Sequence, residues 1–222
     1  MNGLPNVEES YGVELIRKSI HLCSLSIPIV YYFISRPTAL TILVPLTALF
    51  ALSDIARLLH PATGRLYNQY FGFLLRGHEQ NEHGKRLNGA TYVLLSATLC
   101  VLIFPKVIVV TAFTILIISD TSAALIGRKF GKRPFLKKTL EGSTAFFVTA
   151  LIVVAVAPKI GNFAGEYLIG AAAAFLGAIV EAVSNNEIDD NLSIPISVGT
   201  AMWLMYFVFL PAVNVFALDK IG

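Results

Sequence analysis

One carboxylate stands beside two hydroxyl groups inside an otherwise apolar part of the chain. Asp120 is flanked by Ser119 and Thr121. An ionisable side chain in an apolar segment is costly, so it usually serves binding or catalysis. Carboxylate and hydroxyl oxygens at one point suit a hard cation such as Mg2+. We therefore expect a metal site at Asp120.

A segment rich in cations and glycine follows Asp120. Six Lys and Arg side chains lie between positions 128 and 138, next to Gly127 and Gly131. Glycines allow close approach of the backbone, and the cations oppose phosphate charge. Thr139 and Glu141 then stand at the expected start of a helix, where N–H groups favour a phosphate. The competing explanation is that these cations only fix the topology, and no Walker loop occurs.

A third segment, from 180 to 195, combines carboxylates and amides without any Lys or Arg. It holds Glu181, Asp189, Asp190 and Asn191. Asn and Asp are common in ordinary turns, which is the alternative explanation. An acidic segment that faces a basic one nevertheless favours a metal or nucleotide site, because acidic groups hold the cation and basic groups hold the phosphates.

Near the N-terminus, four ionisable residues share one predicted helix face. Glu14, Arg17, Lys18 and His21 are spaced i, i+3, i+4 and i+7. Arg17 and Lys18 alone match cations that extend toward the membrane surface and pair with Glu14. His21 lies deeper in the predicted span, which favours a functional face.

The elements that must position these residues are membrane helices. The 222 residues are 55% hydrophobic and 14% charged, against about 25% charged in soluble domains. Helices of about 20 apolar residues cross a bilayer, and no alternating barrel pattern occurs. We predict an all-α polytopic membrane protein with one catalytic domain over 1–222 and about seven spans. These are 14–34, 37–58, 88–104, 106–126, 142–158, 164–184 and 195–217.

The distribution of Lys and Arg predicts the orientation of the spans. Thirteen of the 17 fall on one side, and Arg36, Lys106, Lys159 and Lys220 fall on the other. The cation-rich side is cytoplasmic in membrane proteins. We therefore expect a cytoplasmic N-terminus, active-site loops at 127–141 and 184–194 on the cytoplasmic side, and residence in the bacterial inner membrane. The polar segment 59–87 is predicted to form an interfacial helix or a connecting loop.

Four motifs resemble the polyprenol kinase family of dolichol kinases, phytol kinases and CTP-dependent diacylglycerol kinases. They are ELIRKSIH (14–21), SDTSAALIGRKFGK (119–132), KTLEGS (138–143) and VEAVS…DDNLSIP (180–195), in family order. CDP-diacylglycerol synthases share a similar second and third block. They also carry a Lys-Asp-rich signature near the C-terminus that has no counterpart here.

The resemblance implies an enzyme that transfers a phosphoryl group, with CTP as donor, to the hydroxyl of a membrane lipid alcohol. It implies Mg2+ at Asp120, Asp190 and Asp189. Lys138 and Asp120 are expected in catalysis, with Glu141 and Glu181 as metal support or proton acceptor. The expected phosphate and nucleotide ligands are Gly127, Arg128, Gly131, Lys132, Lys137, Lys138, Thr139 and Asn191. Arg17, Lys18 and His21 are expected to line the place where the lipid hydroxyl arrives.

The residues leave alternative functions open. A cytidylyltransferase would use the same nucleotide and metal but attack the α-phosphate. A membrane transporter would use intramembrane charges along a substrate path, although such proteins often show internal repeats, which are not visible here. ATP stays open as the donor, as do the identity of the lipid alcohol and a homodimeric state. Nothing points to nucleic acid.

Overall fold

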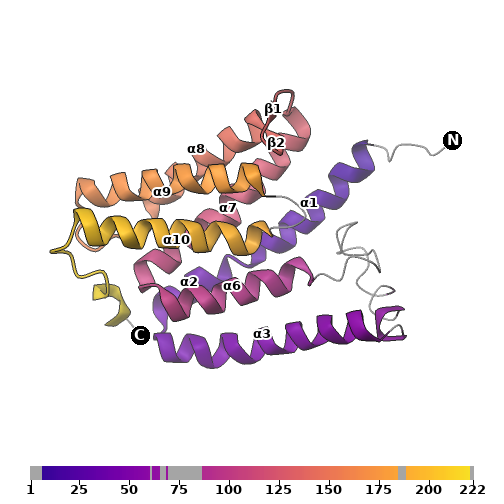
Figure 1. Cartoon of the computed structure of the whole chain (residues 1–222), viewed down its shortest axis with the longest axis horizontal. Coiled ribbons are helices and arrows are strands. Elements are labelled where there is room, and N and C mark those ends of the chain that lie inside the picture. The colour runs from indigo at the N-terminus through magenta and orange to yellow at the C-terminus, as the bar shows by residue number, and fades with distance from the viewer. Residues whose placement is uncertain (1–6, 61, 66–68, 70–86, 185–188, 221–222) are drawn as a thin grey trace.

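The predicted all-α class is confirmed by the structure, a computed structural model that describes residues 7–60, 62–65, 69, 87–184 and 189–220 (Figure 1). The described strands, β1 (Pro134–Phe135) and β2 (Lys138–Thr139), form one short antiparallel hairpin. The helices are α1 (Val7–Cys23), α2 (Ser26–Phe33), α3 (Arg36–Leu59), α6 (Gly89–Ile103), α7 (Lys106–Phe130), α8 (Leu140–Val156), α9 (Ala164–Val183), α10 (Asp190–Phe209) and the 3-10 helix η2 (Ala217–Lys220).

Length and composition identify the chain as an integral membrane protein. Helices α3, α7, α9 and α10 are long and apolar enough to cross a bilayer, and α6 and α8 are shorter apolar helices. Large apolar side chains such as Leu49, Val156 and Phe207 remain exposed on their outer faces. Such surfaces suit contact with lipid tails rather than water.

Helix α7 forms the centre of the bundle. In its most apolar window 78% of the residues are buried, against 22% for α3. Helices α1, α2, α6, α8 and α10 all contact α7, whereas α9 packs on α8 and α10, and α3 packs on α6. A polar residue on α7 is therefore surrounded by neighbouring helices instead of lipid, which makes Asp120 tolerable there.

Three predicted spans differ from the observed helices. The first is two helices, because the chain turns between Cys23 and Ser26. The fourth continues to Phe130, so positions 127–130 of the predicted loop are its last turn. The last begins at Asp190, where Asp189 accepts the N–H of Asn191 as an N-cap, and it ends at Phe209 instead of 217.

Two of the three prolines expected at helix starts are found there. Pro37 sits in the first turn of α3, and Pro105 precedes α7, where a missing N–H costs least. Pro195 was also expected at a helix start but lies inside α10. Most of the predicted interfacial segment 59–87 is outside the described residues, so that prediction stays open.

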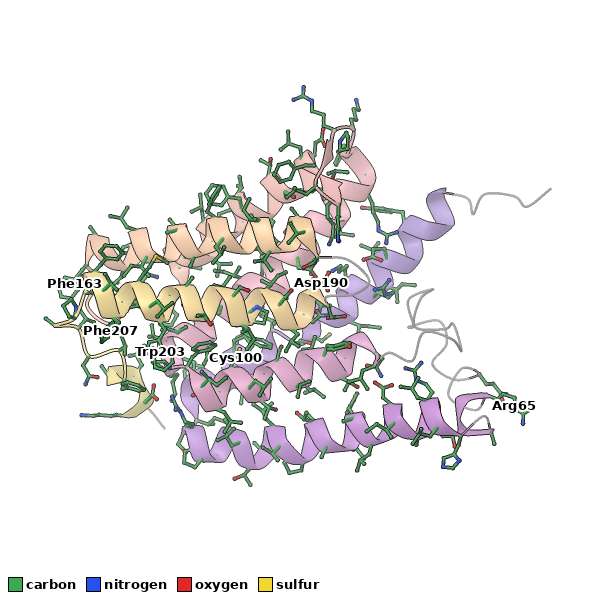
Figure 2. All side chains as sticks on the ribbon, viewed as in Figure 1. Arg65, Cys100, Phe163, Asp190, Trp203 and Phe207 are labelled. Atoms are coloured by element: carbon green, nitrogen blue, oxygen red, sulfur yellow. The ribbon has the colours of Figure 1, made fainter. Side chains whose placement is uncertain are left out.

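Where the structure describes them, cations of the two predicted sets lie at opposite ends of the bundle. Figure 2 shows Asp190 and Arg65 toward one end and Phe163 toward the other. At the second end, Arg36 donates to the carbonyl of Phe104 at 2.8 Å and to Asp219 at 2.7 Å. Asp219 also accepts the backbone N–H of Lys106 at 2.7 Å. These contacts tie η2 to α3 and α7, far from the candidate site.

Candidate active site

Asp120 is the buried carboxylate on the central helix. It is 2% exposed and lies on α7, where α1 packs against it. The ammonium of Lys18 forms a buried ion pair with its Oδ2, and His21 Nε2 lies 3.8 Å from the same oxygen. The N-terminal face predicted from the sequence therefore meets Asp120 directly. Lys18 is 5% exposed, so its side chain does not extend toward water.

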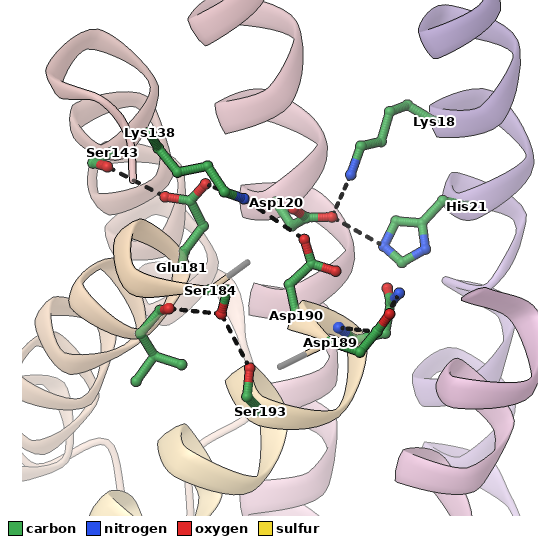
Figure 3. Close-up of polar contacts among 12 residues, drawn as sticks. Lys18, His21, Asp120, Lys138, Ser143, Glu181, Ser184, Asp189, Asp190 and Ser193 are labelled. Atoms are coloured by element: carbon green, nitrogen blue, oxygen red, sulfur yellow. Dashed lines mark hydrogen bonds and ion pairs between the residues drawn. The ribbon is translucent and has the colours of Figure 1, made fainter. Parts of the chain in front are cut away.

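A second group lies beside Asp120 and comes from four further elements (Figure 3). Lys138 on β2 reaches Glu181 on α9 at 3.0 Å and Asp190 on α10 at 3.7 Å. The hydroxyl of Ser143 on α8 donates to Glu181 at 3.2 Å. The basic and acidic segments are thus brought together, as their complementary charges predict.

Lys138 stays positively charged because of these carboxylates. Burial lowers the pKa of Lys138, but the charges of Asp190, Glu181 and Asp120 together outweigh burial and raise the net pKa above its ordinary value. A raised pKa means that the ion pairs of Lys138 stabilise the fold at pH values below the ordinary lysine value where the partner carboxylates are also ionised. This contribution is lost only as pH rises through the higher folded value.

Glu14 joins α1 to the start of the basic segment. Its Oε2 lies 3.0 Å from Arg17 and 3.0 Å from Arg128. The Glu14 side chain is 6% exposed, whereas that of Arg128 is 43% exposed. The sequence predicts Glu14 only as an ion-pair partner of cations on its own helix. Its contact with α7 was missed, because helical spacing reports a shared face and not the helix that the face meets.

The carboxylate of Glu141 shapes the basic segment. It accepts the backbone N–H groups of Lys132 at 3.1 Å and Arg133 at 3.3 Å. The backbone N–H of Lys137 bonds to the carbonyl of Ala182 at 3.0 Å, which fixes the hairpin to the end of α9. Within the described residues, Glu141 is not among the carboxylates that Lys138 contacts, so its direct role in chemistry stays a prediction.

The side chains of Lys132 and Lys137 are exposed, and within the described part of the chain neither pairs with a carboxylate. Arg128 and Lys138 are the cations of the basic segment that the structure brings to the buried acidic groups. Phosphate binding by Lys132 and Lys137 therefore remains a prediction from the sequence.

Glycines in this region bring α7 and α8 together. A Cβ on Gly127 would lie 3.0 Å from Thr139 Oγ1, and one on Gly142 would lie 3.0 Å from the carbonyl of Ala123. A Cβ on Gly131 would lie 2.7 Å from the Thr139 methyl group. Close packing between α7 and α8 and against Thr139 favours glycine at these positions, and nucleotide binding by Gly127 and Gly131 stays a prediction.

The first turn of α8 is already capped. Thr139 Oγ1 accepts the N–H of Gly142 at 3.2 Å, and the N–H of Leu140 bonds to the carbonyl of Arg133 at 2.9 Å. Fewer N–H groups remain for a phosphate than an uncapped helix start would offer.

Asp189 and Asn191 occupy the start of α10. Asp189 Oδ1 accepts both the backbone N–H and the side-chain Nδ2 of Asn191 at 2.9 Å. Asp190, between them, points toward Lys138 (Figure 3). Asp190 therefore belongs to the cluster and Asp189 caps the helix, while metal binding by Asp189 stays a prediction. Residues 185–188 of the predicted loop 184–194 lie outside the described residues.

The donor set fits Mg2+ if a nucleotide shares it. Among the described residues, no three His, Cys, Asp or Glu side chains are grouped to hold a metal by themselves. Mg2+ in nucleotide-dependent enzymes uses one or two carboxylates and takes its other ligands from phosphates and water. The charges of Asp190 and Asp120 both help to raise the pKa of Lys138, so both carboxylates favour a cation in this part of the cluster.

Comparison with known proteins shows three relatives. The chain is 30% identical over 190 residues to an uncharacterized protein of Rickettsia prowazekii, covering 85% of this chain and 93% of the relative. It is 29% identical over 165 residues to CTP-dependent diacylglycerol kinase 1 of Schizosaccharomyces pombe, covering 68% and 74%. It is also 29% identical to CTP-dependent diacylglycerol kinase 1 of Eremothecium gossypii, over 65% of this chain and 51% of that protein.

No family model matches the chain, and no solved structure is detectably similar to it.

Proposed function

Because the chain belongs to the polyprenol kinase family, which includes the CTP-dependent diacylglycerol kinases, we propose that it is a lipid kinase that uses CTP. The oxygen of a lipid hydroxyl attacks the γ-phosphorus of CTP, and the bond from that phosphorus to the β,γ-bridging oxygen breaks. The products are a lipid phosphate, CDP and one proton, which a basic group or water accepts. Such a transfer depends mainly on alignment and on neutralisation of phosphate charge.

The charged residues of the site divide into these roles. Arg128 and Lys138 bind the donor phosphates, and the raised pKa of Lys138 keeps its charge at physiological pH. Asp120 and Asp190 hold Mg2+, which neutralises phosphate charge when bound. Glu181 is better placed than Glu141 to take the hydroxyl proton, because it lies within the cluster beside Ser143.

The acceptor arrives from the membrane along α1. Lys18 and His21 face Asp120, while the neighbouring apolar side chains of Leu15 and Ile20 on the same helix are exposed. Helix α1 therefore joins a lipid-facing surface to the cluster. We place Arg17, Lys18 and His21 beside the acceptor hydroxyl and the lipid tail in the bilayer. Diacylglycerol is the first acceptor to test, because it appears in the names of two relatives.

One observation carries the proposal. Five elements that are distant in sequence, α1, α7, β2, α9 and α10, bring Lys18, Asp120, Lys138, Glu181 and Asp190 together at one end of a membrane bundle. Helix packing alone does not require three buried carboxylates and two lysines at one place. Binding of a triphosphate together with its cation accounts for such a group of charges.

The test is a product assay with purified full-length protein in detergent micelles, Mg2+ and CTP labelled on the γ-phosphate. Diacylglycerol, phytol, a shorter prenol and dolichol are offered separately, and γ-labelled ATP is run in parallel. We expect label in a lipid product and release of CDP. Label in pyrophosphate, with phosphatidate as the lipid, would instead identify a cytidylyltransferase. Absence of any lipid product from all four alcohols would contradict the proposal.

A further inference from the structure

The hairpin between α7 and α8 presents apolar side chains at its tip. Strands β1 and β2 pair Phe135 with Lys138, so Leu136 and Lys137 form a two-residue turn. Leu136 has a φ of 53°, a region that two-residue turns require but that leucine rarely adopts. Its side chain is nevertheless 60% exposed. Glycine or asparagine would satisfy the backbone here, so the turn itself gives no reason for an exposed leucine.

Cations surround this apolar tip. The side chains of Lys129, Lys132, Arg133 and Lys137 are all exposed. Phe130, at the end of α7, is 56% exposed, and the ammonium of Lys129 lies 5.4 Å from its ring centre. Glu141, the acidic residue of the segment, accepts hydrogen bonds from two backbone N–H groups with its carboxylate. The surface is therefore both apolar and strongly positive.

The lengths of the adjoining helices place the hairpin near the bilayer surface. Helix α8 has 17 residues, which span roughly 25 Å, whereas the hydrocarbon core is about 30 Å thick. Helix α7 has 25 residues and spans roughly 37 Å. If α8 crosses the core, its start at Leu140 cannot stand far above the headgroups. The hairpin, which connects Leu140 to the longer α7, then lies at headgroup depth.

We propose that this hairpin docks on an anionic bilayer surface. Leu136 and Phe130 enter the interface, and Lys129 and Arg133 contact acidic headgroups. Basic residues near a membrane surface are attracted to anionic lipids, and exposed apolar side chains add to that attraction. The proposal concerns the surface of the protein and is independent of the kinase reaction.

The experiment uses the full chain in lipid nanodiscs, with Leu136→Trp introduced into a Trp203→Phe background. Because Trp203 is the single tryptophan, the new indole is the only one. Discs contain phosphatidylcholine brominated on its acyl chains, with or without phosphatidylglycerol. We expect quenching of the indole that increases with the anionic lipid and decreases with added salt. In the wild-type protein, Trp203 on the membrane helix α10 is the control indole. Its quenching should not change with lipid charge.

Charge variants complete the test. Lys129→Gln with Arg133→Gln should weaken docking on the order of tenfold, seen as a higher anionic fraction needed for half-maximal quenching. Lys220→Gln, at the opposite end of the bundle, is the control and should leave this fraction unchanged. An indole at 136 with the emission of a water-exposed tryptophan and no quenching would overturn the proposal. Equal quenching with and without phosphatidylglycerol would overturn it as well.

Discussion

Each buried acidic residue of the cluster is paired with a lysine. Asp120 is held by Lys18, and Lys138 is shared by Glu181 and Asp190. Charges buried in this way persist only with partners, because an unpaired one costs several kcal/mol. Removing a single member therefore affects function through its neighbours as well as through its own contacts.

Asp120→Asn should reduce turnover by about two to four orders of magnitude, the range expected for a positioned charged group. The amide keeps the volume of the side chain but loses the charge that pairs with Lys18 and that we propose binds Mg2+. Initial rates at saturating CTP measure the effect, and the apparent melting temperature shows whether the bundle is intact. A folded variant with a rate near that of the wild type would remove Asp120 from the reaction.

Glu14 should act by orienting Arg128, because the ion pair at 3.0 Å restricts the rotamers of a side chain that is 43% exposed. Glu14→Gln and Arg128→Ala should each raise the nucleotide KM by about threefold to tenfold, and the double variant should be no worse than Arg128→Ala alone. Arg65→Ala, which removes a cation elsewhere at this end, is the control. If Glu14→Gln lowered the KM, the carboxylate would be a competitor of the phosphates instead.

The raised pKa of Lys138 gives a prediction about pH. Because its ammonium stays charged well above neutral pH, Lys138→Ala should raise the nucleotide KM by a factor that is constant from pH 7 to about pH 9.5. KM ratios of variant to wild type, measured across this range, provide the test. A ratio that falls steadily toward one above pH 8 would mean that Lys138 loses its proton early.

At the scale of elements, the crossing of α7 and α8 depends on glycine. Gly142→Ala would place a Cβ 3.0 Å from the backbone carbonyl of Ala123 and 3.1 Å from Thr139 Oγ1. Neither the carbonyl nor the capping Thr139 can move without disturbing a helix. We expect the apparent melting temperature to fall by about 2–6 °C, from roughly 1–2 kcal/mol of overpacking.

Gly12→Ala on α1 is the matched control, because no atom lies within 4 Å of its would-be Cβ. It should leave the melting temperature unchanged or raise it slightly, since alanine favours a helix. Equal destabilisation by both substitutions would show that the close crossing of α7 and α8 is not what Gly142 provides.

At the scale of the whole molecule, the cluster lies at the cation-rich end of the bundle, which we propose is cytoplasmic. In a Cys23→Ser, Cys100→Ser background, Arg133→Cys should resist a membrane-impermeant maleimide in intact bacterial cells and react after lysis. Lys220→Cys should react in intact cells. Labelling of position 133 before lysis would place the nucleotide site on the wrong side for cellular CTP.

The sequence alone determined the class of the protein and selected the residues of its candidate site. Hydropathy over about 20 residues reports membrane helices because every backbone group in lipid must be paired within the chain. Asp120, Lys138, Glu181 and Asp190 could be selected because ionisable residues at the ends of apolar segments are rare and costly. Their opposite charges also indicated that the basic and acidic segments would meet.

Only the tertiary structure decided which of these residues are neighbours. Asp190 contacts Lys138, whereas Asp189 caps α10. Among the described residues, Arg128 and Lys138 reach buried carboxylates, whereas Lys132 and Lys137 do not. The helix ends and the two-residue turn set these side-chain directions. The Glu14–Arg128 contact and the close approach at Gly142 depend on how α1 and α8 pack on α7. Packing of separate helices is a non-local property, so the spacing of residues along one helix cannot report it.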